Sequence, residues 1–316
     1  MRLIKRLIQK REFGTLKTDK HETGVLKTVK HESEVAKTTQ FDNSLFYPPA
    51  YPERWLSKHL KPLIIDSKKT HRHINALDLA CGTGQFSLQL TPLFEKVLGV
   101  DSNENQLKYA EKIGEAEIKK GKLEFKKVEY SKIEELFTSL SFKFRDYKFI
   151  FLAQGFERYD YEKFISSFRT AVPEKDSYLV LLGFPVFTIL PESEKLKKGF
   201  FDFSQEILSF YQFNPFSIAK EYKDVKFSNV FEFVEFSNYM DQIKGEPLLD
   251  FLKYLSSWGA YRNYLEANKG QDPFLDLMES LDLKNFKEKD FDKIEFGGKS
   301  PRTISYKTEY FMYILK

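Results

Sequence analysis

Short apolar runs alternate with amphipathic stretches along the first two thirds of the chain. Such runs are typical of strands that are buried on both faces of a sheet, and apolar positions three and four residues apart are typical of helices. We expect strands at residues 76–79, 97–101, 123–128, 148–152 and 178–182. We expect helices at residues 53–65, 103–112, 133–140 and 161–171. Strands that alternate with helices predict a mostly parallel, doubly wound α/β sheet with right-handed crossovers.

The pattern changes after residue 184. Residues 184–222 are aromatic and helical in pattern and are too many for one crossover, so we expect a helical cap inserted over the carboxyl ends of the strands. Further along, the pattern predicts a strand at 226–239 and a helix at 247–267. Residues 304–315 are rich in β-branched and aromatic residues and predict a last, antiparallel strand.

The first forty residues differ from the rest in charge. They carry ten Lys or Arg and five acidic residues, a net charge of +5, whereas the whole chain of 316 residues carries +4. Residues 1–11 are basic and amphipathic, which suits an interfacial helix, an organelle-targeting segment or a frayed terminus. A degenerate ten-residue repeat follows, too short and too polar to bury a core. We therefore expect a mobile basic arm at 1–40 and one folded domain at 41–316.

Cysteine usage, hydropathy and charge limit the class of protein. Cys81 is the only cysteine, which excludes an internal disulfide and a thiolate metal cluster, and we expect no metal site. The nearly neutral folded part gives no reason to expect a nucleic-acid partner. Since no run of about eighteen apolar residues occurs, we expect no membrane span, although the arm could contact a membrane surface weakly. We expect a cytoplasmic protein, or a mitochondrial one if residues 1–11 act as a targeting segment.

A glycine turn follows the first strand, at Gly82 and Gly84, and an amphipathic helix follows the turn. A strand, a glycine turn and a helix start place free backbone N–H groups at the carboxyl edge of a sheet, where nucleotides bind. Asp101 ends the next strand, at the distance from the glycines where an acid holds ribose hydroxyls. Ser87 stands where a dinucleotide site needs a third glycine, and Asp78 places a carboxylate that suits a cationic cofactor.

These stretches resemble the class I S-adenosylmethionine-dependent methyltransferases. Asp78 to Gln85 is similar to the first motif of that family, and Val100 to Leu107 is similar to the second. The resemblance implies a Rossmann-like, seven-stranded sheet and S-adenosylmethionine as cofactor, converted to S-adenosylhomocysteine. It implies cofactor contacts from the glycine loop, the end of the second strand and the two later motifs, at Asp78, Ala80, Gly82, Gly84, Asp101, Ser102, Gln106, Glu129, Tyr130, Ser131 and Gln154. Within this set Asp101 would hold the ribose, Gln106 would pack on the adenine, and Ser131 replaces the usual acid near the adenine amino group.

A narrower resemblance concerns the methyl acceptor. Residues 252–264, which contain Trp258 and Tyr261, are similar to the tyrosine–tryptophan helix of the trans-aconitate methyltransferase-like branch, and so is Tyr51 before the first helix. Glu157 and Arg158 stand where that branch commonly has a His-Trp pair. Arg158, with Arg262, could orient a carboxylate acceptor, whereas Glu157 could accept a proton from a hydroxyl or an amine and would repel a carboxylate.

We therefore predict a methyltransferase that acts on a small, partly apolar molecule, with O-methylation of a carboxylate or a hydroxyl as the reaction. The absence of the His-Trp pair leaves open a binding or regulatory protein that has kept the cofactor site without catalysis. The basic arm leaves open an RNA methyltransferase, which would bind RNA with an affinity that falls steeply with salt.

Overall fold

The computed structural model describes residues 50–128, 147–172, 177–185, 187–190, 194–211, 218, 220–232, 234–269, 271–284, 295–296 and 302–316. The predicted arm at 1–40 and the predicted helix at 133–140 lie outside these residues. No helix in the described part is long and apolar enough to cross a membrane.

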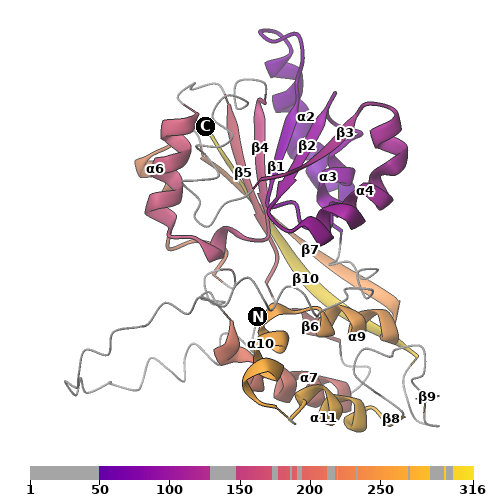
Figure 1. Cartoon of the computed structure of the whole chain (residues 1–316). Coiled ribbons are helices and arrows are strands. Elements are labelled where there is room, and N and C mark those ends of the chain that lie inside the picture. Colours follow the sequence, from indigo (N-terminus) through magenta and orange to yellow (C-terminus); the bar gives the residue numbers. More distant parts are fainter. Residues whose placement is uncertain are drawn as a thin grey trace, which may run out of the picture.

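A mixed sheet forms the centre of the molecule (Figure 1). Its parallel strands are β1 (Ala76–Leu79), β2 (Val97–Asp101), β3 (Leu123–Lys127), β4 (Phe149–Ala153) and β5 (Tyr178–Gly183). The long strand β10 (Thr303–Leu315) runs antiparallel to β5 and also pairs with β7 (Val234–Pro247) and the short β6 (Thr188–Ile189). The order is β3-β2-β1-β4-β5-β10-β6, with β7 beside β10. The mostly parallel sheet with an antiparallel last strand is thus confirmed, with the two-residue β6 in addition to the strands predicted.

The described helices lie around this sheet (Figure 1). They are α2 (Glu53–Ser67), α3 (Gln85–Leu90), α4 (Glu104–Lys119), α6 (Tyr161–Ala171), α7 (Glu194–Glu206), α9 (Leu248–Ser256), α10 (Gly259–Ala267) and α11 (Pro273–Ser280). Short 3₁₀ helices cover Phe156–Arg158, Leu208–Phe210 and Phe227–Asn229. A small antiparallel pair, β8 (Leu283–Lys284) with β9 (Glu295–Phe296), lies next to α11.

The core has two layers because successive strand residues point to opposite faces of the sheet. In β4, Phe149 and Phe151 pack in one layer with Trp55 of α2. Ile150 packs in the other layer with Phe164 of α6. Strands buried on both faces must be apolar at every position, which explains why the central strands read as continuous apolar runs.

Side-chain caps fix where three helices begin. The Asn103 side chain accepts hydrogen bonds from backbone N–H groups of the first turn of α4. Asp160 caps α6 in the same way, and Asp272 caps α11, where Pro273 occupies the first helical position. Such caps satisfy amide groups that have no partner within the helix, and each contributes about 1 kcal/mol.

Helices α7, α9, α10 and α11 gather at one end of the sheet, beyond the carboxyl end of β5 (Figure 1). Helix α7 lies within the predicted cap at 184–222, and the assignment of these residues to a cap over the strand ends stays a prediction. However, the predicted helix 247–267 was wrong as a single element. The hydroxyls of Ser256 and Ser257 donate to the carbonyls of Lys253 and Tyr254, which satisfies the last turn of α9, and Trp258 then adopts an extended conformation.

The predicted strand 226–239 was also displaced. Phe227 and Phe231 lie four residues apart and are both buried on the α6 side of the sheet, so this segment turns as a 3₁₀ helix. The strand β7 begins only at Val234 and continues to Pro247, through a polar stretch that the composition alone does not identify as a strand.

Candidate functional site

The glycine loop connects β1 to α3 and requires left-handed backbone at three positions. Gly82 and Gly84 have φ values of 56° and 81°, and Ala80 between them and the strand has φ 53°. A Cβ on Gly84 would lie 2.6 Å from Cβ of Ala110 and 2.7 Å from the Phe125 ring, so only glycine fits there. The loop is therefore pressed against α4 and β3. Its position is set by packing before any ligand binds.

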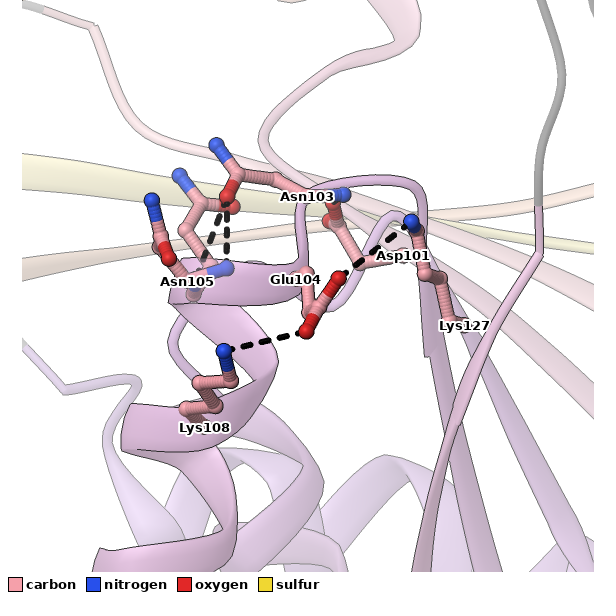
Figure 2. Close-up of polar contacts among 7 residues, drawn as sticks. Asp101, Asn103, Glu104, Asn105, Lys108 and Lys127 are labelled. Carbon is pink, nitrogen blue, oxygen red and sulfur yellow. Dashed lines mark hydrogen bonds and ion pairs between the residues drawn. The ribbon is translucent and has the colours of Figure 1, made fainter. Parts of the chain in front are cut away.

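Asp101, at the end of β2, holds this loop together with the start of α4. Its Oδ2 accepts a hydrogen bond from the Gly82 N–H at 2.9 Å, and its Oδ1 accepts one from the Asn103 N–H at 2.8 Å. Asn103 in turn accepts bonds from the N–H groups of Asn105 and Gln106, as Figure 2 shows in part. The carboxylate is buried, and its two oxygens are fixed in direction by backbone donors.

One ion pair attaches the first turn of α4 to β3, and a second lies within α4. Glu104 lies between Lys108, at 3.0 Å, and Lys127 at the end of β3, at 3.5 Å (Figure 2). Gln106 is partly exposed, and its Oε1 would lie 3.5 Å from a Cβ on Gly82. Gln106 thus lies beside the glycine loop, whereas the partly exposed Ser102 follows Asp101 directly, and cofactor contacts from both stay a prediction.

Asp78 lies beneath the loop, in the middle of β1. It is buried, and its Oδ2 accepts a hydrogen bond from the Ser87 hydroxyl at 2.6 Å. Burial raises the pKa of Asp78 to about 7, although the Ser87 hydrogen bond opposes this rise. Burial also raises the pKa of the Cys81 thiol well above its usual value, so this thiol stays protonated. A dinucleotide-binding site would have glycine at position 87. In this chain the Ser87 hydroxyl donates a hydrogen bond to the buried Asp78 carboxyl instead.

A second loop follows β4 and lies next to the glycine loop, since β1 and β4 are neighbours in the sheet. Gln154 has φ 57°, and Gly155 has φ 153°. The buried Glu157 accepts hydrogen bonds at Oε2 from the Gly155 N–H, at 3.1 Å, and from the Tyr222 hydroxyl, at 2.6 Å. Tyr222 is a site residue that sequence reasoning missed, because it lies 65 residues from Glu157 in the chain and no motif marks it.

Tyr51 lies over the start of α3, at the same edge of the sheet. Its ring packs against Phe86 and Phe184, with centroid distances of 5.2 and 6.1 Å. Burial raises the pKa of its hydroxyl well above the usual value, and the nearby carboxylates of Glu157 and Asp78 raise it further. The structure therefore brings Tyr51 together with Glu157, Asp78 and the glycine loop.

Arg158 is exposed beside Glu157, and Arg262 of α10 is partly buried. Burial lowers the pKa of Arg262, and the positive charge of Arg158 lowers it further, whereas Glu266 opposes both effects. Arg158 thus lies close enough to Arg262 for the two charges to interact.

The two aromatic candidates of the cap pack inside it. Tyr261 is buried against Phe203 and Phe274, and its hydroxyl donates to Asp272 at 2.8 Å. Trp258 is half-buried and packs against Phe200, Phe203 and Tyr254. The structure does not bring Tyr261 to the glycine loop, and a role of either residue in catalysis stays a prediction. Glu129, Tyr130 and Ser131 lie outside the described residues.

Comparison with known proteins supports the class that this geometry indicates. Residues 70–180 match a family model described as a methyltransferase domain, and this range contains the glycine loop, Asp101 and Glu157. A search among curated proteins found no match. The match supports a class I methyltransferase domain over these residues. The resemblance to the trans-aconitate methyltransferase-like branch stays a prediction.

Among solved structures, the chain is similar to a protein from Anaeromyxobacter dehalogenans that is provisionally described as a type II methyltransferase. The TM-score is 0.55 at 19% identity, over 85% of this chain and 97% of that chain. The YcgJ protein from Bacillus subtilis has a TM-score of 0.39 at 12% identity, over 81% of this chain and 98% of that one. A provisionally described methyltransferase from Bacillus halodurans has a TM-score of 0.38 at 13% identity, over 82% and 99%. The first similarity shows the fold alone, a Rossmann-like, mostly parallel sheet with an antiparallel strand and flanking helices.

Proposed function

We propose that the protein is an S-adenosylmethionine-dependent methyltransferase that methylates a hydroxyl group of a small molecule. The residues at the carboxyl ends of β1, β2 and β4 fit this cofactor. The glycine loop is packed against α4 and β3, the buried Asp101 holds an oriented carboxylate at its edge, and Gln106 lies beside the loop. When bound, the cofactor supplies an activated methyl group on a sulfonium.

The observation that carries the choice of acceptor is the buried Glu157 carboxylate. Among the described residues, both hydrogen bonds to this carboxylate fall on Oε2, from Gly155 and Tyr222, which leaves Oε1 as the oxygen that takes a proton. A hydroxyl acceptor needs a proton acceptor within hydrogen-bond reach, whereas a carboxylate acceptor would be repelled. Tyr51, whose hydroxyl stays protonated, donates to the acceptor or to the cofactor. Holding the two reactants in line and excluding water contributes several kcal/mol to catalysis, at most about 7–11.

A second candidate is methylation of a carboxylate, and one observation favours it. Arg158 and Arg262 come from different elements and lie close enough to repel each other. Two neighbouring guanidinium groups suit a bound carboxylate, because each can form two parallel hydrogen bonds to it.

The experiment combines cofactor binding with turnover on matched acceptors. We expect calorimetry to detect binding of S-adenosylhomocysteine, and an absence of binding would overturn the proposal. Turnover is then measured on pairs of alcohols and acids that share a carbon skeleton. We expect Glu157→Gln to lower kcat on the alcohol about 10²- to 10⁴-fold while affinity for S-adenosylhomocysteine is retained. The control is Glu162→Gln, which changes an exposed carboxylate on α6.

The outcomes separate the two candidates. Activity on acids alone, lost in Arg262→Ala and retained in Glu157→Gln, would replace the hydroxyl acceptor with a carboxylate. Binding of the cofactor without turnover on alcohols, acids or amines would support a regulatory binding protein instead.

A further inference from the structure

Strand β7 forms one edge of the sheet. Within the described residues it pairs with β10 and with no other strand, and it is 14 residues long (Figure 1). In an antiparallel ladder every second residue directs its N–H and C=O groups away from the neighbouring strand, so the outer side of β7 presents a row of backbone donors and acceptors. Such an edge is complementary to another extended strand.

Natural proteins usually protect an edge of this kind, and β7 is protected only near its end. Lys244, Gly245 and Pro247 lie in its last four residues, where the pairing with β10 shifts in register. The ten residues from Val234 to Ile243 contain no Lys, Arg, Gly or Pro and pair with β10 in one unbroken register. Since lysine, proline and bulges are the usual means of blocking edge-to-edge pairing, this stretch is open to it.

Apolar side chains gather on the same stretch. In the described part of the chain seven large apolar side chains are exposed, and five of them lie between residues 230 and 240: Val230, Val234, Phe236, Tyr239 and Met240. Met240 is 53% exposed. Because successive residues of a strand point to opposite faces, exposed apolar groups flank the edge on both faces. Clustered exposed apolar groups mark a surface that binds another protein.

The order of residues along β7 makes the strand complementary to its own copy. When a two-fold axis relates two antiparallel strands of one sheet, the residue on the axis lies opposite itself, and residues equally far on either side lie opposite each other. With Met240 on the axis, Asn238 lies opposite Gln242, and Tyr239 lies opposite Asp241. Two amides can bond to each other, a hydroxyl can donate to a carboxylate, and methionine meets methionine at the centre.

The neighbouring registers are less favourable. An axis at Asn238 would place Glu235 opposite Asp241, and an axis at Asp241 would place this carboxylate opposite its own copy. Like charges directly opposite each other destabilise a pair of strands. An axis at Tyr239 would place the Glu235 carboxylate opposite Ile243, which offers it no hydrogen bond. The register centred on Met240 is therefore the most favourable of the four.

We propose that two copies of this chain associate through β7, with Met240 on the two-fold axis, so that their sheets join into one. A second copy carries an edge of the same length and of complementary sequence. The two-fold arrangement is closed, because each β7 edge covers the other and neither remains open to a further strand. This inference goes beyond methyl transfer and does not depend on it.

The test measures the mass of the full chain in solution by sedimentation equilibrium. We expect the wild type to be a dimer at micromolar concentration, with twice the 37.3 kDa mass of one chain. Met240→Lys places two ammonium groups opposite each other, and we expect it to raise the dissociation constant of the dimer at least about a hundredfold. The control is Leu275→Lys, which changes an exposed apolar side chain on α11 and should leave the dimer intact.

A mixture of two variants tests the position of the axis. Met240→Glu should be monomeric for the same reason as Met240→Lys, and an equimolar mixture of the two should form the heterodimer, because opposite charges then face each other. Circular dichroism confirms that each variant is folded, as expected for a change at an exposed side chain. A monomeric wild type, a dimer that persists in Met240→Lys, or a mixture that stays monomeric would each overturn the inference.

Discussion

The burial of Asp78 predicts a pH dependence of stability that one substitution removes. The pKa of this carboxyl rises from 3.8 to about 7 in the folded protein because the side chain is buried in the sheet. The folded state therefore binds a proton that the unfolded chain releases between these two values. The stabilising contribution of Asp78 is present in full below about pH 4 and is lost as the pH rises toward 7.

The magnitude follows from the two pKa values. A tenfold change in proton affinity corresponds to about 1.4 kcal/mol, so the whole rise amounts to about 4 kcal/mol, of which about 3 kcal/mol falls between pH 5 and pH 8. Asp78→Asn keeps the shape and an oxygen that accepts from Ser87, and it cannot ionise. We expect the free energy of unfolding of this variant, relative to the wild type, to rise by about that amount over this pH range.

The assay is urea unfolding of both proteins at pH 5, 6, 7 and 8. Asp66→Asn provides the control, because Asp66 is exposed and its pKa is lowered by Lys69, so it does not titrate above pH 5. A difference between Asp78→Asn and the wild type that stays constant from pH 5 to pH 8 would show that Asp78 titrates normally. The reasoning about its burial would then be wrong.

Three further substitutions test how the site is held. Gly84→Ala should lower the free energy of unfolding, measured by thermal unfolding, by about 2 kcal/mol or more, because the added methyl group strains the left-handed backbone and clashes with its neighbours. The control Gly121→Ala should cost about 1 kcal/mol, because φ is also positive there, at +70°, but nothing lies within 4 Å. Equal losses would show that packing does not select glycine at Gly84. Asp101→Asn places an amide NH₂ group against one of the two backbone N–H donors. We expect calorimetry to show at least tenfold weaker binding of S-adenosylhomocysteine. An unchanged affinity would show that Asp101 is not part of the binding site. Ser237→Ala removes the hydrogen-bond partner of Trp55 Nε1 and of His59 Nε2, and we expect it to cost about 1–3 kcal/mol in urea unfolding with no change in ligand affinity. A change in affinity would contradict a purely structural role.

The Ser237 contact also shows how a catalytic pattern can arise from packing. His59 lies 2.9 Å from the Ser237 hydroxyl and 2.6 Å from a Glu235 oxygen, which are distances found in hydrolytic triads. The serine oxygen, however, also accepts from Trp55 Nε1 at 2.9 Å. These contacts link α2 to β7, and we assign them a role in stability.

The parallel part of the fold could be predicted from the sequence because burial on both faces leaves an unmistakable apolar run, as at Phe149–Ala153. The glycine loop could be predicted for a related reason, since left-handed backbone and close packing require glycine at Gly84. The division between α9 and α10 could not, because it depends on which carbonyls Ser256 and Ser257 bond. Periodicity does not record that choice.

The candidate site divides in the same way. Asp101 acts through backbone groups close to it in sequence, so its place follows from local spacing. The pairing of Glu157 with Tyr222 depends on how a distant segment returns to the sheet. The apolar spacing correctly places Tyr261 on a buried face of its helix. The spacing does not show that the Tyr261 hydroxyl donates a hydrogen bond to Asp272.

The left-handed backbone of Ala80 and Gln154 has a consequence for engineering. Each holds a conformation that costs a non-glycine residue about 1 kcal/mol or more, and each stands at the end of a central strand, one in each of the two loops that form the site. Glycine at either position would relieve that cost and raise the melting temperature, and it would also free the loop to move when no ligand is present. Thermostable variants are therefore better sought outside these two loops, since stability gained within them would be exchanged for a less ordered binding surface.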